Sequence, residues 1–298
     1  MRTKMTCCSL LILVLAAPPL LAQSKAKKDM SPEEISAATL GTNEQQHTAF
    51  APHKIIGNVY FVGTEILGSF LVATSDGLIL INSSFEANVP IIRAGVEKLG
   101  FKFSDIKIVL GSHAHADHQE GDAMIRQLTG AQVMAMAEDV PALQRMRPGG
   151  KDHSIDRTLH DGDTVVLGGL TLVAHLTPGH TAGNTTWTLK AAEDGKSYDV
   201  CILGGQGATA GQTFFNANGL TATGEQFTRS FKFLRTLHCD VPLGSHNSMY
   251  NLAEKFPKVG KGPNPYIDPA GYFEELDARE RVFNLRLEEQ KKASGKSN

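Results

Sequence analysis

The 298-residue chain carries 29 Lys and Arg against 31 Asp and Glu, with 41% apolar and 20% charged residues. This composition excludes an intrinsically disordered chain and is typical of a globular protein. The net charge of −2 leaves no broad basic surface for binding nucleic acid, so we expect no nucleic-acid partner. The length fits one large α/β domain.

The first 22 residues have the features of a secretory signal peptide. Arg2 and Lys4 give a positive start, residues 10–15 form an apolar core, and residues 18–22 end in a small residue. The apolar run is too short to span a membrane. We expect residues 1–22 to be removed, which leaves a chain of net charge about −4 with no membrane contact. An uncleaved membrane anchor is the alternative.

The expected mature chain, residues 23–298, is predicted to be a single domain with an N-terminal extension over about residues 23–50. In this polar extension Ser31 can cap a short helix, because Pro32 occupies the first helical position and Glu34 follows three residues after the cap.

Strands and helices alternate after the extension, which predicts a layered α/β core. Glycine and Asp-Gly turns separate the first three strands, and Gly100 and Gly130 end the first two helices. Strands are predicted at 55–62, 70–73, 78–81, 105–110, 133–137, 165–167, 170–176, 185–189, 200–203 and 239–243, and helices at 87–99, 123–128, around 227–234 and from 268 onward.

Cysteine use after residue 22 is sparse. Only Cys201 and Cys239 remain, both in apolar strand-like contexts, so the fold cannot depend on a network of disulfides. We interpret them as buried free thiols, with a single mutual bridge as the alternative.

The most informative stretch is His113-Ala-His115-Ala-Asp117-His118, which directly follows the apolar strand at 105–110. Imidazoles and a carboxylate are ligands that suit Zn²⁺. In an extended segment His113 and His115 point the same way and can share one ion. Asp117 and His118 can reach a second position if the chain turns there, so the motif predicts a metal site at a strand end.

Two further histidines follow predicted strands. His180 lies in the turn Thr-Pro-Gly-His-Thr after residue 176, and His246 follows the strand that ends at residue 243. Loops beyond one edge of an α/β sheet converge, so both histidines are natural partners of the first motif. The remaining histidines of the mature chain lack this placement, and we interpret them as surface or core residues.

These three motifs, in this order and spacing, resemble the metallo-β-lactamase superfamily. The resemblance runs from about residue 50 to 290, and over this range the sequence is most similar to the third subclass of true zinc β-lactamases. It implies a four-layer αβ/βα sandwich with the metal site at its open edge. A secretory signal fits the periplasmic members, so the expected location is the periplasm.

The resemblance implies two zinc ions. By position, His113, His115 and His180 would hold the first zinc, and Asp117, His118 and His246 would hold the second. The implied activity is the attack of a zinc-activated hydroxide, oriented by Asp117, on a β-lactam, which is a small-molecule substrate. The resemblance also implies that the enzyme is a monomer and that its activity confers antibiotic resistance.

Other hydrolases on the same fold are the main alternative. Glyoxalase II and the acyl-homoserine lactonases carry an aspartate that bridges both metals, at the end of the strand after the Thr-Pro-Gly-His-Thr turn. Here that strand ends Leu203-Gly-Gly-Gln206-Gly, and no carboxylate follows before Glu225. The missing ligand favours the β-lactamase. A metal-binding protein without turnover is a third possibility.

The sequence departs from the subclass pattern at two places. Residues 199–229 contain no serine, although members usually carry serines there that hold water or the substrate carboxylate. Gln206, Thr209 or Thr213 can substitute, and a simple turn role for Gln206 is the alternative. At the other place, Asn82 stands in a turn where the family commonly has an acidic residue, which predicts weaker zinc affinity unless Asn82 merely shapes the turn.

Overall fold

A computed structural model describes residues 25–209 and 211–295. The predicted signal peptide, residues 1–22, lies outside the described residues. Among the helices that are described, none is long and apolar enough to cross a membrane.

The first sheet contains seven strands in the order of the sequence. Strands β1 to β4 pair antiparallel, and β4 to β7 pair parallel, so the chain changes from hairpins to crossovers at β4. The strands are β1 (His53–Ile56), β2 (Val59–Phe61), β3 (Phe70–Thr74), β4 (Gly77–Ile81), β5 (Ile106–Leu110), β6 (Gln132–Met136) and β7 (Arg157–Leu159).

The second sheet has the order β14-β11-β10-β9-β8. Its pairs are antiparallel except for β11 and β14, which run parallel with Leu203 opposite Gly244. Its strands are β8 (Thr164–Leu167), β9 (Leu170–Leu176), β10 (Thr185–Glu193), β11 (Lys196–Leu203) and β14 (Val241–Gly244). A separate small hairpin joins β12 (Phe215–Asn216) to β13 (Gly219–Leu220).

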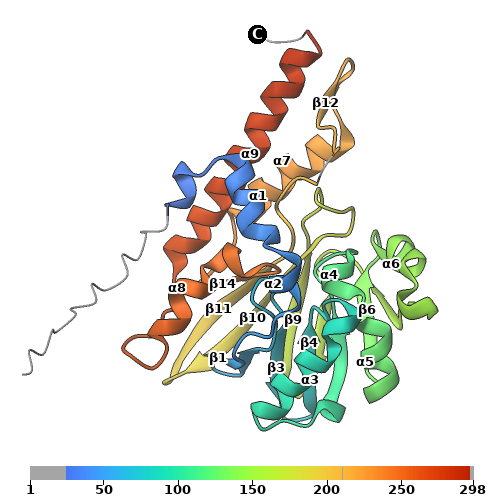
Figure 1. The fold of residues 1–298 in the computed structure, drawn as a ribbon, viewed down its shortest axis with the longest axis vertical. Helices are drawn as coiled ribbons and strands as arrows, with labels where there is room; N and C mark the ends of the chain where they lie inside the picture. The colour runs from blue at the N-terminus through green and yellow to red at the C-terminus, as the bar shows by residue number, and fades with distance from the viewer. Residues whose placement is uncertain (1–24, 210, 296–298) are drawn as a thin grey trace, which may run out of the picture.

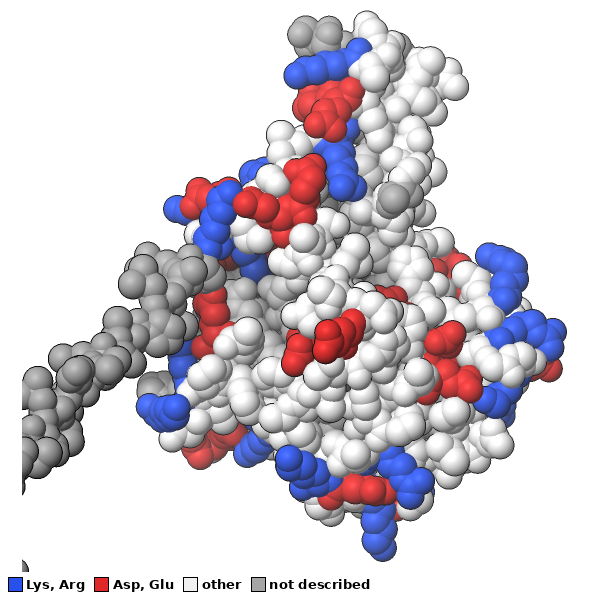
Figure 2. Space-filling model, viewed as in Figure 1, with Lys and Arg blue, Asp and Glu red and all other residues white. Residues whose placement is uncertain are grey.

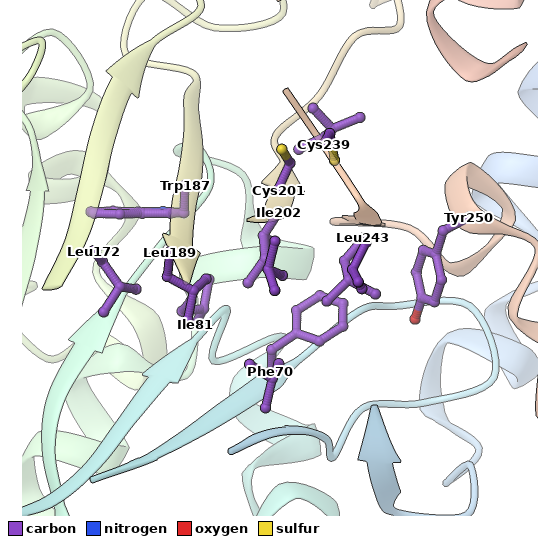
Figure 3. Close-up of a cluster of buried hydrophobic side chains, with 14 of the residues drawn as sticks. Phe70, Ile81, Leu172, Trp187, Leu189, Cys201, Ile202, Cys239, Leu243 and Tyr250 are labelled. Atoms are coloured by element: carbon purple, nitrogen blue, oxygen red, sulfur yellow. The ribbon is translucent and has the colours of Figure 1, made fainter. Parts of the chain in front are cut away.

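The two sheets pack face to face around one apolar core. Alternate residues of β3 and β4, such as Phe70 and Ile81, meet Leu172, Trp187 and Leu243 of the second sheet (Figure 3). The lone tryptophan is fully buried, and its indole N–H donates to the carbonyl of Gly111 (3.0 Å). This bond joins the second sheet to the start of the histidine motif.

Helices cover both outer faces (Figure 1). Val89, Ile92 and Val96 of α3 (Val89–Lys98) and Ile125 of α5 (Asp122–Thr129) pack on the outward-facing residues of the first sheet. Helices α7 (Ala222–Leu234) and α9 (Pro269–Ala293) cover the second sheet. This is the predicted four-layer αβ/βα sandwich.

The remaining helices are short. They are α1 (Pro32–Leu40), α2 (Asn43–His47), α4 (Ala116–Gln119), α6 (Val140–Met146), α8 (Leu252–Lys255) and the 3-10 helices Lys27–Asp29, Glu86–Asn88, Phe103–Asp105, Pro148–Gly150, Asn247–Tyr250 and Phe256–Lys258. Helix α1 begins with the predicted capping box, in which the Ser31 hydroxyl accepts the Glu34 N–H and the Glu34 carboxylate accepts the Ser31 N–H.

Two details of the predicted elements were wrong. The strand expected over 55–62 is broken into β1 and β2, because Gly57 adopts a positive φ of 53° in a tight turn. Helix α6 and strand β7 were not predicted. Each is short, and α6 has a proline near its start, so neither carries a long periodic pattern.

The N-terminal extension lies along α9 (Figure 1). Lys27 forms an ion pair with Glu275, and the hydroxyl of Thr39 accepts a hydrogen bond from Arg279. Cys201 and Cys239 are buried free thiols, as interpreted from the sequence. Basic and acidic side chains are interspersed around the edge of the face in Figure 2, so the charge on that face is mixed.

Candidate functional site

Four strand ends converge at one edge of the sandwich and position the predicted ligands. The motif with His113 follows β5, and His180 follows β9 in the other sheet. Gln206 follows β11, and His246 follows β14. The loops are tied together across the sheets, because the Thr185 N–H donates to the carbonyl of Ser112 (2.7 Å). The six predicted ligands therefore share one location.

His113, His115 and His180 form the first group. Their nearest ring nitrogens all lie within 4.8 Å of one another, and the Nε2 of His180 is 3.2 Å from the Nδ1 of His115. The ring of His113 stands edge-on to both partners, at centroid distances of 4.8 and 4.4 Å. Three imidazole nitrogens thus point at a common position.

A hydrogen bond sets the orientation of His180. Its Nδ1 contacts the carbonyl oxygen of Gly207, which can only accept, so Nδ1 carries the proton. The lone pair is therefore on Nε2, which faces His115. A second hydrogen-bond partner of this kind is the usual way to fix a histidine as a metal ligand.

Asp117, His118 and His246 form the second group. Asp117 Oδ2 lies 3.2 Å from His118 Nε2 and 3.6 Å from His246 Nε2. The rings of His118 and His246 are 4.9 Å apart. His113 also lies within 4.8 Å of the ligand atoms of Asp117 and His118, so it stands between the two groups. Helix α4 makes the turn that directs Asp117 and His118 away from His115.

Burial keeps His113, His180 and His246 neutral. It lowers the pKa of His180 to about 4 and of His246 to about 3, and with the neighbouring histidines it holds the pKa of His113 well below the usual value. Burial also opposes ionisation of Asp117, but the neighbouring histidines together outweigh it, so the pKa of Asp117 lies well below its ordinary range. Neutral imidazoles and an ionised carboxylate are the protonation states that metal binding requires.

Among the described residues, His113 Nε2, His118 Nδ1 and His246 Nδ1 are buried ring nitrogens of this cluster without a hydrogen-bond partner. The Nε2 of His118 has only its contact with Asp117 Oδ2, at 3.2 Å. A buried polar atom without a partner is destabilising unless something satisfies it. A metal ion would satisfy His113 Nε2 and one nitrogen of His118, because each imidazole offers one nitrogen to an ion. A set of imidazoles with one carboxylate suits zinc. The site therefore fits the predicted metal.

Asp139, which sequence reasoning missed, joins the two ligand-bearing loops from behind. Its carboxylate accepts hydrogen bonds from the Ala114 N–H (2.8 Å), the Gly183 N–H (2.7 Å) and the Thr181 hydroxyl (2.7 Å). It precedes α6, an element that was itself not predicted. No motif signals it, because its partners are two backbone groups and one hydroxyl far away in the sequence.

Asn82 is buried directly beneath the motif. Its amide donates to the carbonyl of Gly68 (3.0 Å), and its amide oxygen accepts the N–H of Ser112 (2.9 Å). Its backbone is left-handed, with φ of 65°. Asn82 thus shapes the turn and also links two loops of the site, and the weaker zinc affinity stays a prediction.

A cavity of about 390 Å³ opens beside the six ligands. Gln206 and Thr209 line it, whereas Thr213 is not among its lining residues. The side chain of Gln206 is 5% exposed, and neither of its amide atoms has a hydrogen-bond partner in the described part of the chain. Gln206 is therefore available to a bound molecule after a small adjustment.

The glycines after β11 leave no space for side chains. A β-carbon on Gly205 would overlap with the ring of His180, and one on Gly204 would overlap with the amide of Asn184. Asn184 itself accepts the Gly205 N–H (2.6 Å), which holds this backbone against β10. No carboxylate can enter the site from these two positions while His180 keeps its place.

Comparison with known proteins gives a consistent picture. Residues 68–192 match the family model of the metallo-beta-lactamase superfamily. The native FEZ-1 metallo-beta-lactamase from Legionella gormanii is 42% identical with a TM-score of 0.77, over 82% of this chain and 98% of that one. BJP-1, a subclass B3 metallo-beta-lactamase of Bradyrhizobium japonicum, is 30% identical with a TM-score of 0.75, over 84% and 98%.

Among curated sequences the similarity is more local. A hydroxyacylglutathione hydrolase of Rhodospirillum rubrum is 34% identical over 96 residues, which are 32% of this chain and 33% of that protein. The chain thus matches about a third of the length of such curated relatives.

Proposed function

The chain belongs to the metallo-β-lactamase superfamily and is a hydrolase that resembles class B3 members, and on this premise we propose that it hydrolyses the β-lactam amide bond of penicillins, cephalosporins and carbapenems. The observation that carries the proposal is the site itself. Six ligands meet at a strand edge where Gly204 and Gly205 exclude a bridging carboxylate.

Two zinc ions per chain belong to this proposal. His113, His115 and His180 would hold one, and Asp117, His118 and His246 the other. Bound zinc supplies a Lewis acid for the substrate carbonyl and lowers the pKa of a coordinated water to about 7. The unpartnered ring nitrogens of the cluster support this assignment.

The chain's own groups orient the reaction. Asp117 is ionised at neutral pH, so its carboxylate accepts a hydrogen bond from the attacking water and aims the water oxygen at the β-lactam carbonyl carbon. The water oxygen bonds to that carbon, the C–N bond breaks, and the water proton ends on the nitrogen. The cavity beside Asp117 and His180 holds the substrate.

Hydrolysis of a thioester or a lactone is the second candidate, favoured by the local similarity to hydroxyacylglutathione hydrolases. The crowding around Gly205 argues against it, because the bridging carboxylate of those relatives has no space here.

The test is a panel on zinc-loaded protein that compares nitrocefin, a penicillin, a carbapenem, an acyl-homoserine lactone and an acylglutathione thioester. We expect the β-lactams to be the preferred substrates, activity to vanish with a chelator, and added zinc to restore it. A preference for the lactone or thioester, zinc binding with no turnover, or chelator-resistant β-lactam hydrolysis would each overturn the proposal.

We also propose that the enzyme acts in the periplasm, where it would confer resistance. The composition of residues 1–22 supports an export signal. Fractionation of cells and N-terminal sequencing of the mature protein test this. A start at Gln23 in the periplasmic fraction is expected, and an intact N-terminus in the membrane fraction would contradict it.

A further inference from the structure

The cavity beside the metal ligands has a second wall, made by the N-terminal extension and α9. Helix α1 contributes residues such as Ile35 and Thr39, and α9 contributes Arg279 and Arg286. The two arginines are the basic side chains among the residues that line it. The cavity is thus lined both by predicted ligands and by two guanidinium groups.

Arg279 is held in position by two of its three nitrogens. Its Nε donates to Glu275 Oε1 (2.7 Å), and its Nη2 donates to the hydroxyl of Thr39 (2.9 Å). The side chain is 7% exposed. Its Nη1 has no hydrogen bond to any described residue and lies toward Gly207, where an added β-carbon would be 3.5 Å away. This nitrogen, beside the loop after β11, remains free for a ligand.

The positive charge of Arg279 is not cancelled by Glu275. The two carboxylate oxygens of Glu275 are divided between two cations, because Oε1 pairs with Arg279 and Oε2 pairs with Lys27, each at 2.7 Å. Burial opposes ionisation of Glu275, but Arg279 and Lys27 outweigh it and lower its pKa, so Glu275 is an anion. Lys27, Arg279 and Glu275 therefore carry two positive charges and one negative charge beside the cavity.

We propose that Arg279 binds the carboxylate of the β-lactam substrate. Lys27 is a positioning residue: because it shares Glu275, this carboxylate does not fully neutralise the charge of Arg279. The inference rests on the proposed β-lactam hydrolysis. Penicillins, cephalosporins and carbapenems carry a carboxylate on the carbon next to the lactam nitrogen. When the β-lactam carbonyl lies at the metal ligands, the substrate carboxylate must contact other residues that line the cavity.

Arg286, Ser36 and Thr209 also line the cavity and can donate to an anion. Of the two arginines, Arg279 is the one held in place by side chains, those of Glu275 and Thr39. No serine occurs over residues 199–229 of the loop after β11. A guanidinium presents N–H groups in a planar fork that matches a carboxylate, and in a buried cavity this contact is strong. Gln206, with its unpartnered amide, can add a neutral hydrogen bond beside it.

The test compares a cephalosporin acid with its methyl ester, which keeps the lactam but removes the negative charge. On zinc-loaded protein we expect the wild type to have a much lower KM for the acid. In Arg279→Gln the ratio of ester KM to acid KM should fall about tenfold or more. Arg279→Lys should lie between, because it keeps a charge but loses the fork.

Lys27→Met tests the inference independently, because it leaves every contact of Arg279 with the cavity in place. It should also lower the ratio of ester KM to acid KM. Arg281→Gln is the matched control on α9. Arg281 also anchors the extension, through the Met30 carbonyl (2.6 Å), but it does not line the cavity. Lys25→Met, at an exposed pair with Glu34, is the control for Lys27. Both controls should keep the wild-type ratio.

Melting temperature and zinc content, measured on every variant, identify changes that come from folding. If Arg279→Gln does not fold, the ratios of ester KM to acid KM in Arg279→Lys and Lys27→Met test the inference. An unchanged acid preference in the folded Arg279 and Lys27 variants would overturn the inference while leaving β-lactam hydrolysis intact. A wild type that hydrolyses neither the acid nor the ester would instead overturn the proposed function.

Discussion

Asp139 accepts the backbone N–H of Ala114, the residue between the first two histidines of the motif, at 2.8 Å. The same carboxylate holds the loop of His180 through Gly183 and Thr181. One side chain therefore sets the distance between loops from two different sheets. The six ligands depend on it, although it contacts none of their side chains through a hydrogen bond.

Asp139→Asn should weaken zinc binding without unfolding the protein. An amide has one acceptor oxygen and a donor group, so it cannot accept all three hydrogen bonds. Loss of such an outer contact typically lowers metal affinity or activity about 10- to 100-fold. Competition with a chromophoric chelator measures the affinity. Asp156→Asn is the control, because Asp156 also accepts a backbone N–H, from Val133, but away from the site. Equal zinc affinity in the two variants would contradict the prediction.

Asn82→Asp should destabilise the protein even though it restores the residue type that the family commonly has. The Asn82 amide donates to the Gly68 carbonyl, and a carboxylate there would face that oxygen in a buried setting. We expect a loss of about 1–3 kcal/mol in the free energy of unfolding, measured with denaturant on metal-free protein. Asn251→Asp, at another left-handed asparagine, controls for backbone preference. An unchanged or higher stability would refute this role for the amide.

Gln206→Ala should change substrate affinity and leave the zinc content as it is. Gln206 lines the cavity, and its buried amide has no partner in the described chain, so a substrate that reaches the amide would satisfy its hydrogen-bonding capacity. Loss of one neutral hydrogen bond predicts a KM about 2- to 10-fold higher. Steady-state kinetics on several β-lactams, beside metal analysis, provide the measurement. Gln132→Ala, on the exposed side of β6, is the control. A KM that stays at the wild-type value for every substrate would remove Gln206 from the site.

Glu275→Gln should make stability less dependent on acid. The folded pKa of Glu275 lies below the ordinary value of 4.5, so its ionised form stabilises the protein above pH 4.5, and this contribution disappears as the pH falls through the folded pKa. Removing the anion from between Lys27 and Arg279 should destabilise the protein by roughly 3–5 kcal/mol at pH 7. The gap to the wild type should narrow below pH 4.5.

Melting temperatures of the wild type and Glu275→Gln at pH 7, 5 and 4 test this. Glu288→Gln is the control, because Glu288 pairs with Lys291 at the exposed surface and should change stability little. A gap for Glu275→Gln that stays constant from pH 7 to pH 4 would show that the carboxylate is not ionised in the way inferred.

The sequence predicts that the six candidate ligands come together, because they lie in short motifs at strand ends. His113 to His118 are contiguous, and the strands before them are long apolar runs. The same alternation of strands and helices predicts a layered α/β core, and the resemblance to the family implies its four-layer arrangement. The break at Gly57 was missed, because a single turn glycine is a weak signal within an apolar run.

Contacts between distant parts of the chain could not be predicted from the sequence. Lys27 and Glu275 are 248 positions apart, and neither belongs to a motif, so only the packing of the extension on α9 brings them together. The cavity wall with Arg279 was missed for the same reason. Asp139 lies in a segment whose short helix has no extended periodicity, and two of its three partners are backbone groups that any residue supplies.

The close contact between Gly205 and His180 also limits how this enzyme can evolve. A mutation that places an aspartate at position 205 collides with a ligand of the site it would have to join. His180 must move first, and a displaced His180 loses its bond to Gly207 and its place beside His115. A path to the chemistry of the aspartate-bridged relatives therefore passes through an intermediate that has lost the old site and has not yet gained the new one.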